Sequence, residues 1–72
     1  MHLSPKQEQI LCLVAQDCCN REIAKRLGIS SRTVESHLQR LYERHNLHTR
    51  AALVAKWIME GGRPDGGVFR TQ

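Results

Sequence analysis

The chain has 72 residues, of which 40% are hydrophobic but only one each is Trp, Tyr or Phe, and its formal net charge is +4. A chain of this length forms a single domain close to the lower size limit for a self-sufficient core, and that core must be largely aliphatic. No apolar run is long enough to span a membrane and no charged-then-apolar leader opens the chain, so we expect a soluble, cytoplasmic protein with no membrane partner. The positive charge favours a polyanionic partner.

The three cysteines are not expected to form a disulfide or metal framework. Cys12, Cys18 and Cys19 lack CxxC spacing, and adjacent cysteines rarely bond to each other because the ring is strained. A zinc site that combined them with the four histidines is the less favoured alternative. We expect no metal and no cofactor, with Cys12 and one of the adjacent pair packed as small apolar residues.

A first helix is predicted over about 5–16. Ser4 is its expected N-cap, Pro5 occupies the first helical position, and Gln7 completes a capping box. Apolar residues then recur at helical spacing. They are Ile10, Leu11, Val14 and Ala15.

The segment NREIAKRLGISSRTVESHLQRL contains two helical patterns separated by a very short turn. Asn20 is expected to cap a second helix over 21–27, which Gly28 ends because glycine tolerates positive φ. A helix that ends in glycine, a turn of about three residues and another helix together form a helix-turn-helix. The same pattern also occurs at ordinary corners between two helices.

A third helix is predicted over 31–45, capped by Ser30 or Ser31, with Asn46 as a left-handed C-cap. Its buried stripe consists of Val34, Leu38 and Leu41.

A fourth helix is predicted over about 50–60, and its sequence AALVAKWIME is apolar on more than one face. Trp57 is the largest of these apolar residues, which exceed what one core-facing stripe can use. The Gly- and Pro-rich stretch 61–72 is expected to be a flexible, disordered tail. The fold class is therefore all-α: a four-helix domain over 1–60 that contains a helix-turn-helix.

The outer face of the third helix carries side chains that suit base edges and phosphates. The expected base-reading residues are Glu35, Ser36, Gln39 and Arg40. Phosphate contacts are expected from residues on and around the same unit, namely Asn20, Arg21, Lys25, Arg32, Thr33, Arg44 and Arg50. A merely solvated helix face is the alternative interpretation.

The motifs LSPKQEQIL, NREIAKRLGIS and RTVESHL, followed by Leu41, Leu47, Thr49 and Arg50, resemble the LuxR/GerE-type helix-turn-helix domain of bacterial transcription regulators. The resemblance runs from about Leu3 to Met59. It implies a third helix in the major groove and a fourth helix that pairs two subunits over a roughly palindromic site. It also implies a phosphate contact by Thr33. The expected dimer contacts on the fourth helix are Ala52, Ala55, Lys56 and Met59.

The chain departs from the family pattern at several positions. Glu35 stands where the family usually has Lys or Arg, so the preferred DNA sequence should differ from common family sites. Gln7 replaces a Glu, and Asp17 occupies a loop position often held by Gly. His45 and Asn46 stand where Leu and Gly are frequent.

The resulting hypothesis is a sequence-specific regulator that binds double-stranded DNA as a homodimer, with RNA polymerase or a larger LuxR-type regulator as further partners. Region four of bacterial sigma factors shares the EIA…LGIS…TV pattern and is one alternative, although His37 and the apolar fourth helix favour the LuxR type. A small protein that heterodimerises with a larger regulator and antagonises it is another. An enzyme is not expected, because no paired carboxylates, Ser-His-Asp grouping or phosphate-binding Gly loop appears.

Overall fold

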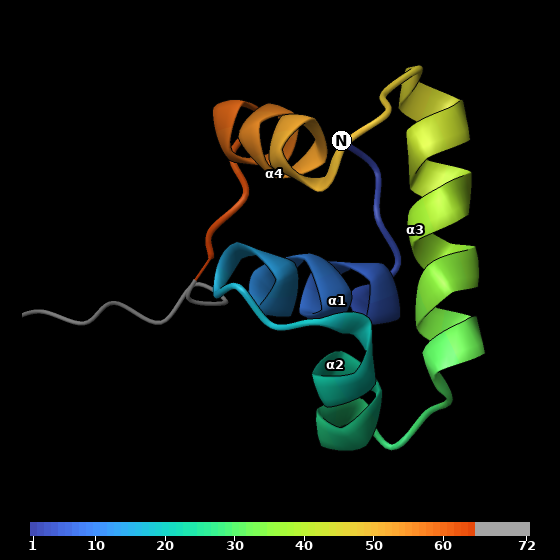
Figure 1. Ribbon diagram of the computed structural model, residues 1–72. Coiled ribbons are helices and arrows are strands. Elements are labelled where there is room, and N and C mark those ends of the chain that lie inside the picture. Colours follow the sequence, from blue (N-terminus) through green and yellow to red (C-terminus); the bar gives the residue numbers. More distant parts are fainter. Residues whose placement is uncertain (65–72) are drawn as a thin grey trace, which may run out of the picture.

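The computed structural model describes residues 1–64, which form four α-helices and no strand (Figure 1). They are α1 (Pro5–Ala15), α2 (Asn20–Leu27), α3 (Ser31–His45) and α4 (Arg50–Met59). The prediction of an all-α, four-helix domain is confirmed. Residues 65–72 of the expected tail lie outside the described residues. Within the described part, no helix is both long and apolar enough to cross a bilayer.

Three of the four helices begin at a hydroxyl cap. The capping box of α1 is formed as predicted, because Ser4 Oγ accepts from the Gln7 amide at 3.1 Å and Gln7 Oε1 accepts from the Ser4 amide at 3.0 Å. Ser30 caps α3 and Thr49 caps α4 by accepting from the backbone three residues later. These caps satisfy backbone N–H groups that have no partner inside the helix.

The start of α2 differs from the prediction. Its N-cap is Cys19, which makes no side-chain capping hydrogen bond, and Asn20 is the first residue of the helix itself. The expectation that Asn20 caps α2 is therefore wrong. The physical reason is tertiary, because the Asn20 carboxamide oxygen accepts a hydrogen bond from Arg50 at 2.8 Å.

The turn between α2 and α3 depends on Gly28. Its φ of 68° and ψ of 34° place it in the left-handed region, as predicted, and its backbone N–H donates to the Ala24 carbonyl. The Ile29 amide donates to the same carbonyl at 3.0 Å, which closes the end of α2. Ala24 is buried, and this small side chain allows α2 and α3 to pack closely.

The core lies where α1 meets the other three helices. In Figure 1, α1 and α4 lie one above the other, α2 lies beneath α1, and α3 stands along one side of the molecule. The buried residues are Ile10, Leu11, Val14, Cys18, Ile23, Ala24, Val34, Leu38, Leu41, Leu53 and Trp57. Trp57 is only 2% exposed, so it is part of this core and not of an apolar surplus.

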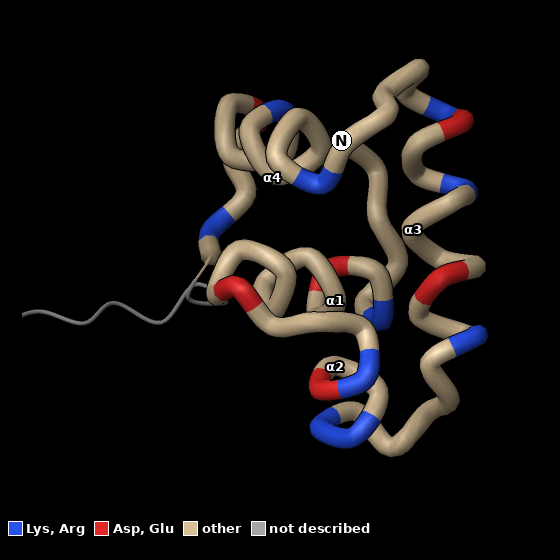
Figure 2. Tube along the Cα trace, in the orientation of Figure 1, with Lys and Arg blue, Asp and Glu red and all other residues tan. Residues whose placement is uncertain are grey.

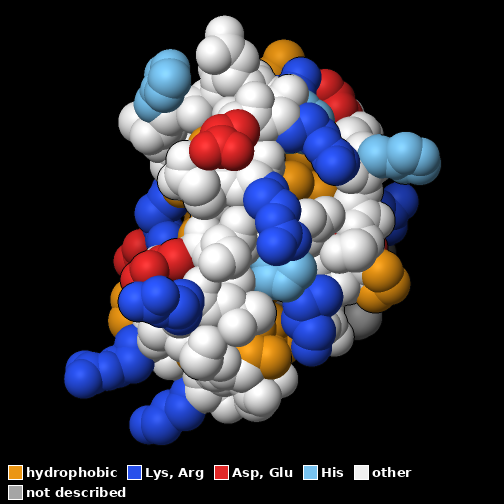
Figure 3. Space-filling view, turned by 90° about the vertical axis from the view of Figure 1, so that its right-hand side faces the viewer, with side chains coloured by type: hydrophobic (Ala, Val, Ile, Leu, Met, Phe, Trp, Pro, Cys, Tyr) orange, Lys and Arg blue, Asp and Glu red, His pale blue; other side chains and the backbone are white. Residues whose placement is uncertain are grey.

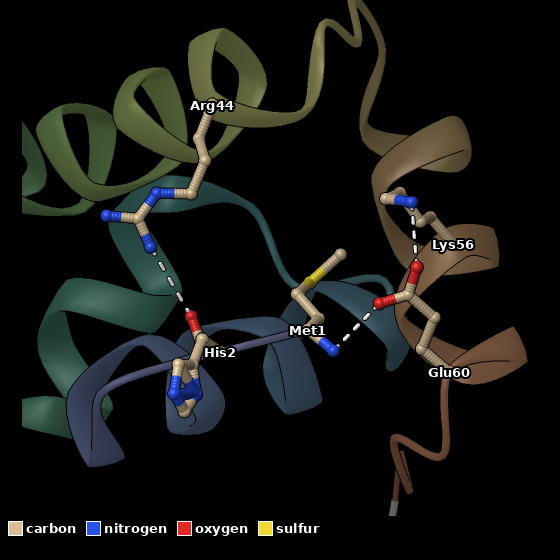
Figure 4. Close-up of polar contacts among 5 residues, drawn as sticks. All are labelled: Met1, His2, Arg44, Lys56 and Glu60. Carbon is tan, nitrogen blue, oxygen red and sulfur yellow. Dashed lines mark hydrogen bonds and ion pairs between the residues drawn. The ribbon is translucent and has the colours of Figure 1, made fainter.

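Both ends of the described chain pack onto the helices. The Met1 amino group and Lys56 Nζ each lie 2.7 Å from the Glu60 carboxylate, and these contacts lower its pKa to about 2 (Figure 4). At the other end, residues 61–64, which the sequence analysis assigned to the tail, lie against α1. Gln16 Nε2 donates to the Pro64 carbonyl at 3.3 Å.

Arg50 ties the start of α4 to the start of α2. Its guanidinium donates from Nη1 to Asn20 Oδ1 and from Nη2 to the Cys18 carbonyl, both at 2.8 Å. Two parallel donors on a planar fork suit a guanidinium and not an ammonium. Through this contact, α4 fixes the position of α2, the first helix of the helix-turn-helix.

We expect Gly28→Ala to lower the free energy of unfolding by about 1 kcal/mol. No atom lies within 4 Å of an added Cβ, so the cost arises from the positive φ and not from a clash. Thermal denaturation followed by circular dichroism should show a melting temperature about 4–8 °C lower. Gly28→Asn is the matched control, since asparagine tolerates this conformation better. Equal melting of wild type and Gly28→Ala would contradict the prediction.

We expect Arg50→Lys to lower the free energy of unfolding by about 1–2 kcal/mol, because a lysine cannot serve both acceptors in the same geometry. Chemical denaturation measures the loss. Arg21→Lys, at an exposed position of α2, is the control and should unfold like the wild type. Unchanged stability of Arg50→Lys would show that the tie between α2 and α4 does not contribute.

Candidate nucleic-acid interface

The outward surface of α3 carries two ridges of polar side chains. Val34, Leu38 and Leu41 face the core, so the side chains on the opposite side of α3 point away from the molecule. Residues four apart lie above one another on a helix and form a ridge. One ridge consists of Arg32, Ser36 and Arg40, and the other of Glu35, Gln39 and Glu43; all six residues are exposed.

The two ridges differ in hydrogen-bonding character. The arginines can only donate hydrogen bonds, whereas ionised Glu35 and Glu43 can only accept them. Gln39 can do both, and its Nε2 donates to Glu43 Oε2 at 3.1 Å. All four predicted base-reading residues, Glu35, Ser36, Gln39 and Arg40, therefore lie exposed on one surface. The ridge of Arg32, Ser36 and Arg40 is called the donor ridge below, and the ridge of Glu35, Gln39 and Glu43 beside it mostly accepts hydrogen bonds.

Basic side chains and His37 lie beside the donor ridge. His37 is half-buried between the core and this ridge, and its Nδ1 is buried without a hydrogen-bond partner. Burial, and then the charges of Arg40 and Lys6, lower the pKa of His37, which favours the neutral imidazole. In Figure 3, which shows this side of the molecule, Lys and Arg side chains run along the surface with a histidine between them.

An open depression lies where three helices begin. It is lined by Asp17, Cys18, Cys19, Asn20, Arg21, Ser31, Glu35 and Arg50. Helix N-termini carry partial positive charge, and the start of α2 has no side-chain cap to satisfy its first N–H groups. Together with the exposed Arg21, these features favour an anion, whereas the Asp17 and Glu35 carboxylates in the same lining oppose one.

The predicted phosphate-contacting residues fall into separate groups. Asn20, Arg21 and Arg50 surround the depression, but Arg50 and Asn20 bond to each other and Arg50 also holds Cys18. Lys25 is exposed on the next turn of α2, where Figure 2 shows further basic residues.

The remaining predicted phosphate contacts lie on α3. Arg32 is exposed at the first turn of α3. The neighbouring Thr33 hydroxyl lies 2.9 Å from the hydroxyl of Ser30, the N-cap of α3. Arg44 lies near the other end of α3, and one guanidinium nitrogen contacts the His2 carbonyl at 3.5 Å (Figure 4). The set therefore lies along α2 and α3, with Arg50 at the start of α4.

The predicted dimer residues share the side of α4 that turns away from the core. Ala55 is exposed and Met59 is 84% exposed, while Ala52 and Lys56 are half-buried. Lys56 is already paired with Glu60 one turn later. Ile58, 43% exposed, adds to the apolar surface next to Met59.

Sequence reasoning missed two contacts at this interface. The hydrogen bond between Gln39 and Glu43 could have been predicted from the sequence, because residues four apart on a helix are neighbours. The bond between Arg50 and Asn20 could not, since the two residues lie thirty positions apart in the chain. Within the part of the chain that the structure describes, no three His, Cys, Asp or Glu side chains gather as a metal site.

Comparison with known proteins agrees with this geometry. The family model described as "Bacterial regulatory proteins, luxR family" matches residues 1–61. The protein Rv0890c of Mycobacterium tuberculosis, whose name is that of an HTH-type transcriptional regulator, is 40% identical over 59 residues, which are 82% of this chain and 7% of that protein.

Two further relatives have names of regulatory proteins. The tetrathionate response regulatory protein TtrR of Salmonella typhimurium is 38% identical over 55 residues, which are 76% of this chain and 27% of the relative. Response regulator Rre1 of Synechocystis is 33% identical over 61 residues, which are 85% and 26% of the two chains. The chain thus spans less than a third of the length of each of these relatives.

No solved structure matches the chain significantly. The family match nevertheless covers all four helices, including the whole helix-turn-helix. The chain belongs to the luxR family of bacterial regulatory proteins, as its sequence motifs indicated.

Proposed function

We propose that the chain is a sequence-specific regulator of transcription that binds double-stranded DNA with α3 in the major groove. The observation that carries the proposal is the exposed pair of polar ridges on α3, Arg32–Ser36–Arg40 and Glu35–Gln39–Glu43, within a helix-turn-helix of the luxR family. The names of its relatives, as transcriptional and response regulators, support the same function.

The dimensions of α3 suit the groove. A helix of 15 residues is about 22 Å long, and the major groove of B-DNA is wide enough to admit one helix. Each base pair presents a distinct set of donors and acceptors there, which the six ridge side chains can contact. Base readout is assigned to Glu35, Ser36, Gln39 and Arg40.

Phosphate attraction comes from the residues around α3. Arg21 and Lys25 lie on α2, while Arg32 and Thr33 lie at the first turn of α3 and Arg44 lies in its last turn, where the two DNA backbones would pass. For Asn20 and Arg50 the contribution is indirect: their mutual hydrogen bond holds the start of α2, whose backbone N–H groups face the anion.

Dimerisation through α4 completes the proposal. The exposed side chains of Ala55, Ile58 and Met59 give α4 an apolar surface that its own core does not use. A symmetric contact between two such helices would bury it and set two recognition helices about 34 Å apart, one turn of duplex. The target would then be a roughly palindromic site. The same surface favours a second candidate, pairing with the α4 helix of a longer family member.

Gln39→Ala should weaken binding to the preferred duplex by about 1–3 kcal/mol and relax the preference at one base pair of each half-site. Lys25→Ala, at an exposed position of α2, should instead weaken binding to preferred and scrambled duplexes alike. The preferred duplex is obtained by selection from a random pool, and titrations on both duplexes measure the effects. Equal weakening by Gln39→Ala on the two duplexes would exclude Gln39 from base readout.

Met59→Glu should abolish most of the cooperativity on a duplex with two half-sites and leave the affinity for a single half-site nearly unchanged. The side chain is 84% exposed, so the substitution should not disturb the fold. Gel-shift titrations on both duplexes, with circular dichroism as a check of folding, measure this. Gln9→Glu, on exposed α1 surface, controls for the added negative charge. Undiminished cooperativity in Met59→Glu would place the dimer contact elsewhere.

A further inference from the structure

The side-chain amide of Gln39 is held in one orientation by Glu43. Nε2 of Gln39 lies 3.1 Å from Glu43 Oε2. An ionised carboxylate can only accept hydrogen bonds, so the atom of Gln39 that faces it must be the nitrogen. The carbonyl oxygen Oε1 is therefore the end of the amide that is turned away from Glu43.

The other neighbour on this ridge reinforces the same orientation. Glu35 lies four residues before Gln39, as Glu43 lies four residues after it, and both carboxylates are exposed. Neither can donate a hydrogen bond to Oε1 of Gln39. The Gln39 oxygen is thus left available on the outward surface of α3, while one of the two hydrogens on its nitrogen is engaged within the ridge.

This orientation matters because glutamine is otherwise ambiguous towards DNA. With its oxygen forward, a glutamine accepts from the amino groups of adenine N6 or cytosine N4 in the major groove. With its nitrogen forward, it donates to guanine O6 or N7, to thymine O4, or to adenine N7. A free glutamine rotates between the two and discriminates weakly between the two classes of base.

We propose that Glu43 is a specificity-determining residue that acts through Gln39. By holding Nε2, it turns Oε1 towards the groove and favours a contacted base that carries an amino group, adenine or cytosine. Glu43 is a positioning residue in this role, and the proposal rests on the proposed function, DNA readout by α3.

The test uses the selected duplex in four versions, with each base in turn on the contacted strand at the position that Gln39→Ala identifies. Wild-type protein should bind the adenine and cytosine versions at least about fivefold more tightly than the guanine and thymine versions. Glu43→Gln keeps the shape of the side chain but allows both amide orientations, so the ratio should fall to about twofold or less.

Two further variants separate orientation from charge. Gln39→Glu can only accept, so it should still reject guanine and thymine even though the added charge weakens every duplex. Glu22→Gln is the matched control: it removes an equal charge from an exposed i,i+4 pair on α2, with Arg26, and should leave the ratio at the wild-type value.

The outcomes distinguish this inference from the proposed function. If wild-type protein binds selected and scrambled duplexes equally, DNA readout itself fails. If it selects a half-site but Glu43→Gln leaves the base ratio unchanged, or if wild type prefers guanine or thymine at this position, the positioning role of Glu43 is overturned while readout by α3 stands.

Discussion

The close contact between α2 and α3 is the constraint on which the rest of the structure depends. Only three residues connect the two helices, and the chain can reverse there because Gly28 adopts positive φ. The reversal brings Ala24 and Val34 into the core, with each of them buried. Once α3 is fixed along α2, its polar ridges have one possible direction, away from α1. The outward direction of both polar ridges follows from this geometry.

The remaining helices act as supports for that pair. Helix α1 contributes Ile10 and Leu11, which are fully buried, and α4 covers it with Leu53 and Trp57. Arg50 then connects the start of α4 back to the start of α2 through two hydrogen bonds of 2.8 Å. The half-buried Arg50 guanidinium donates to the Cys18 carbonyl and to the Asn20 side-chain oxygen at once, which gives this contact a defined geometry. The start of α2 is therefore held both by the connection from α1 and by Arg50 of α4.

Features set by residues close in sequence could be predicted without a structure. The capping box of Ser4 and Gln7, the left-handed Gly28 and Asn46, and the buried stripe of α3 all depend on spacings of a few residues. Backbone sterics and helix periodicity are local, so the sequence contains what is needed to predict them.

Features that depend on tertiary contacts could not be predicted in this way. Asparagine is a common N-cap residue, yet the Asn20 side chain accepts a hydrogen bond from Arg50, thirty positions later. The apolar pattern of the fourth helix predicts more apolar side chains than its core-facing stripe can use, but Trp57, the largest of them, is buried in the core. For the candidate site, the exposed face of α3 followed from its buried stripe. The orientation of Gln39 did not, because it depends on which of several possible neighbours its amide contacts.

The positions of the two chain ends bear on how such a unit is joined to other domains. Met1 lies on the α4 side of α3, and residues 61–64 lie at the C-terminal end of α1, so both ends of the described chain lie away from the outer surface of α3 (Figure 1). A polypeptide that continues from either end therefore extends from the supporting helices. This placement gives a physical reason why a matching segment can make up 7% of one relative and 27% of another. In a chain that continued before Met1, the amino group beside Glu60 would become a neutral amide, and that carboxylate would retain only Lys56. Joining another domain before Met1 would thus alter the contact with Glu60 next to α4, while α3 would be unaffected.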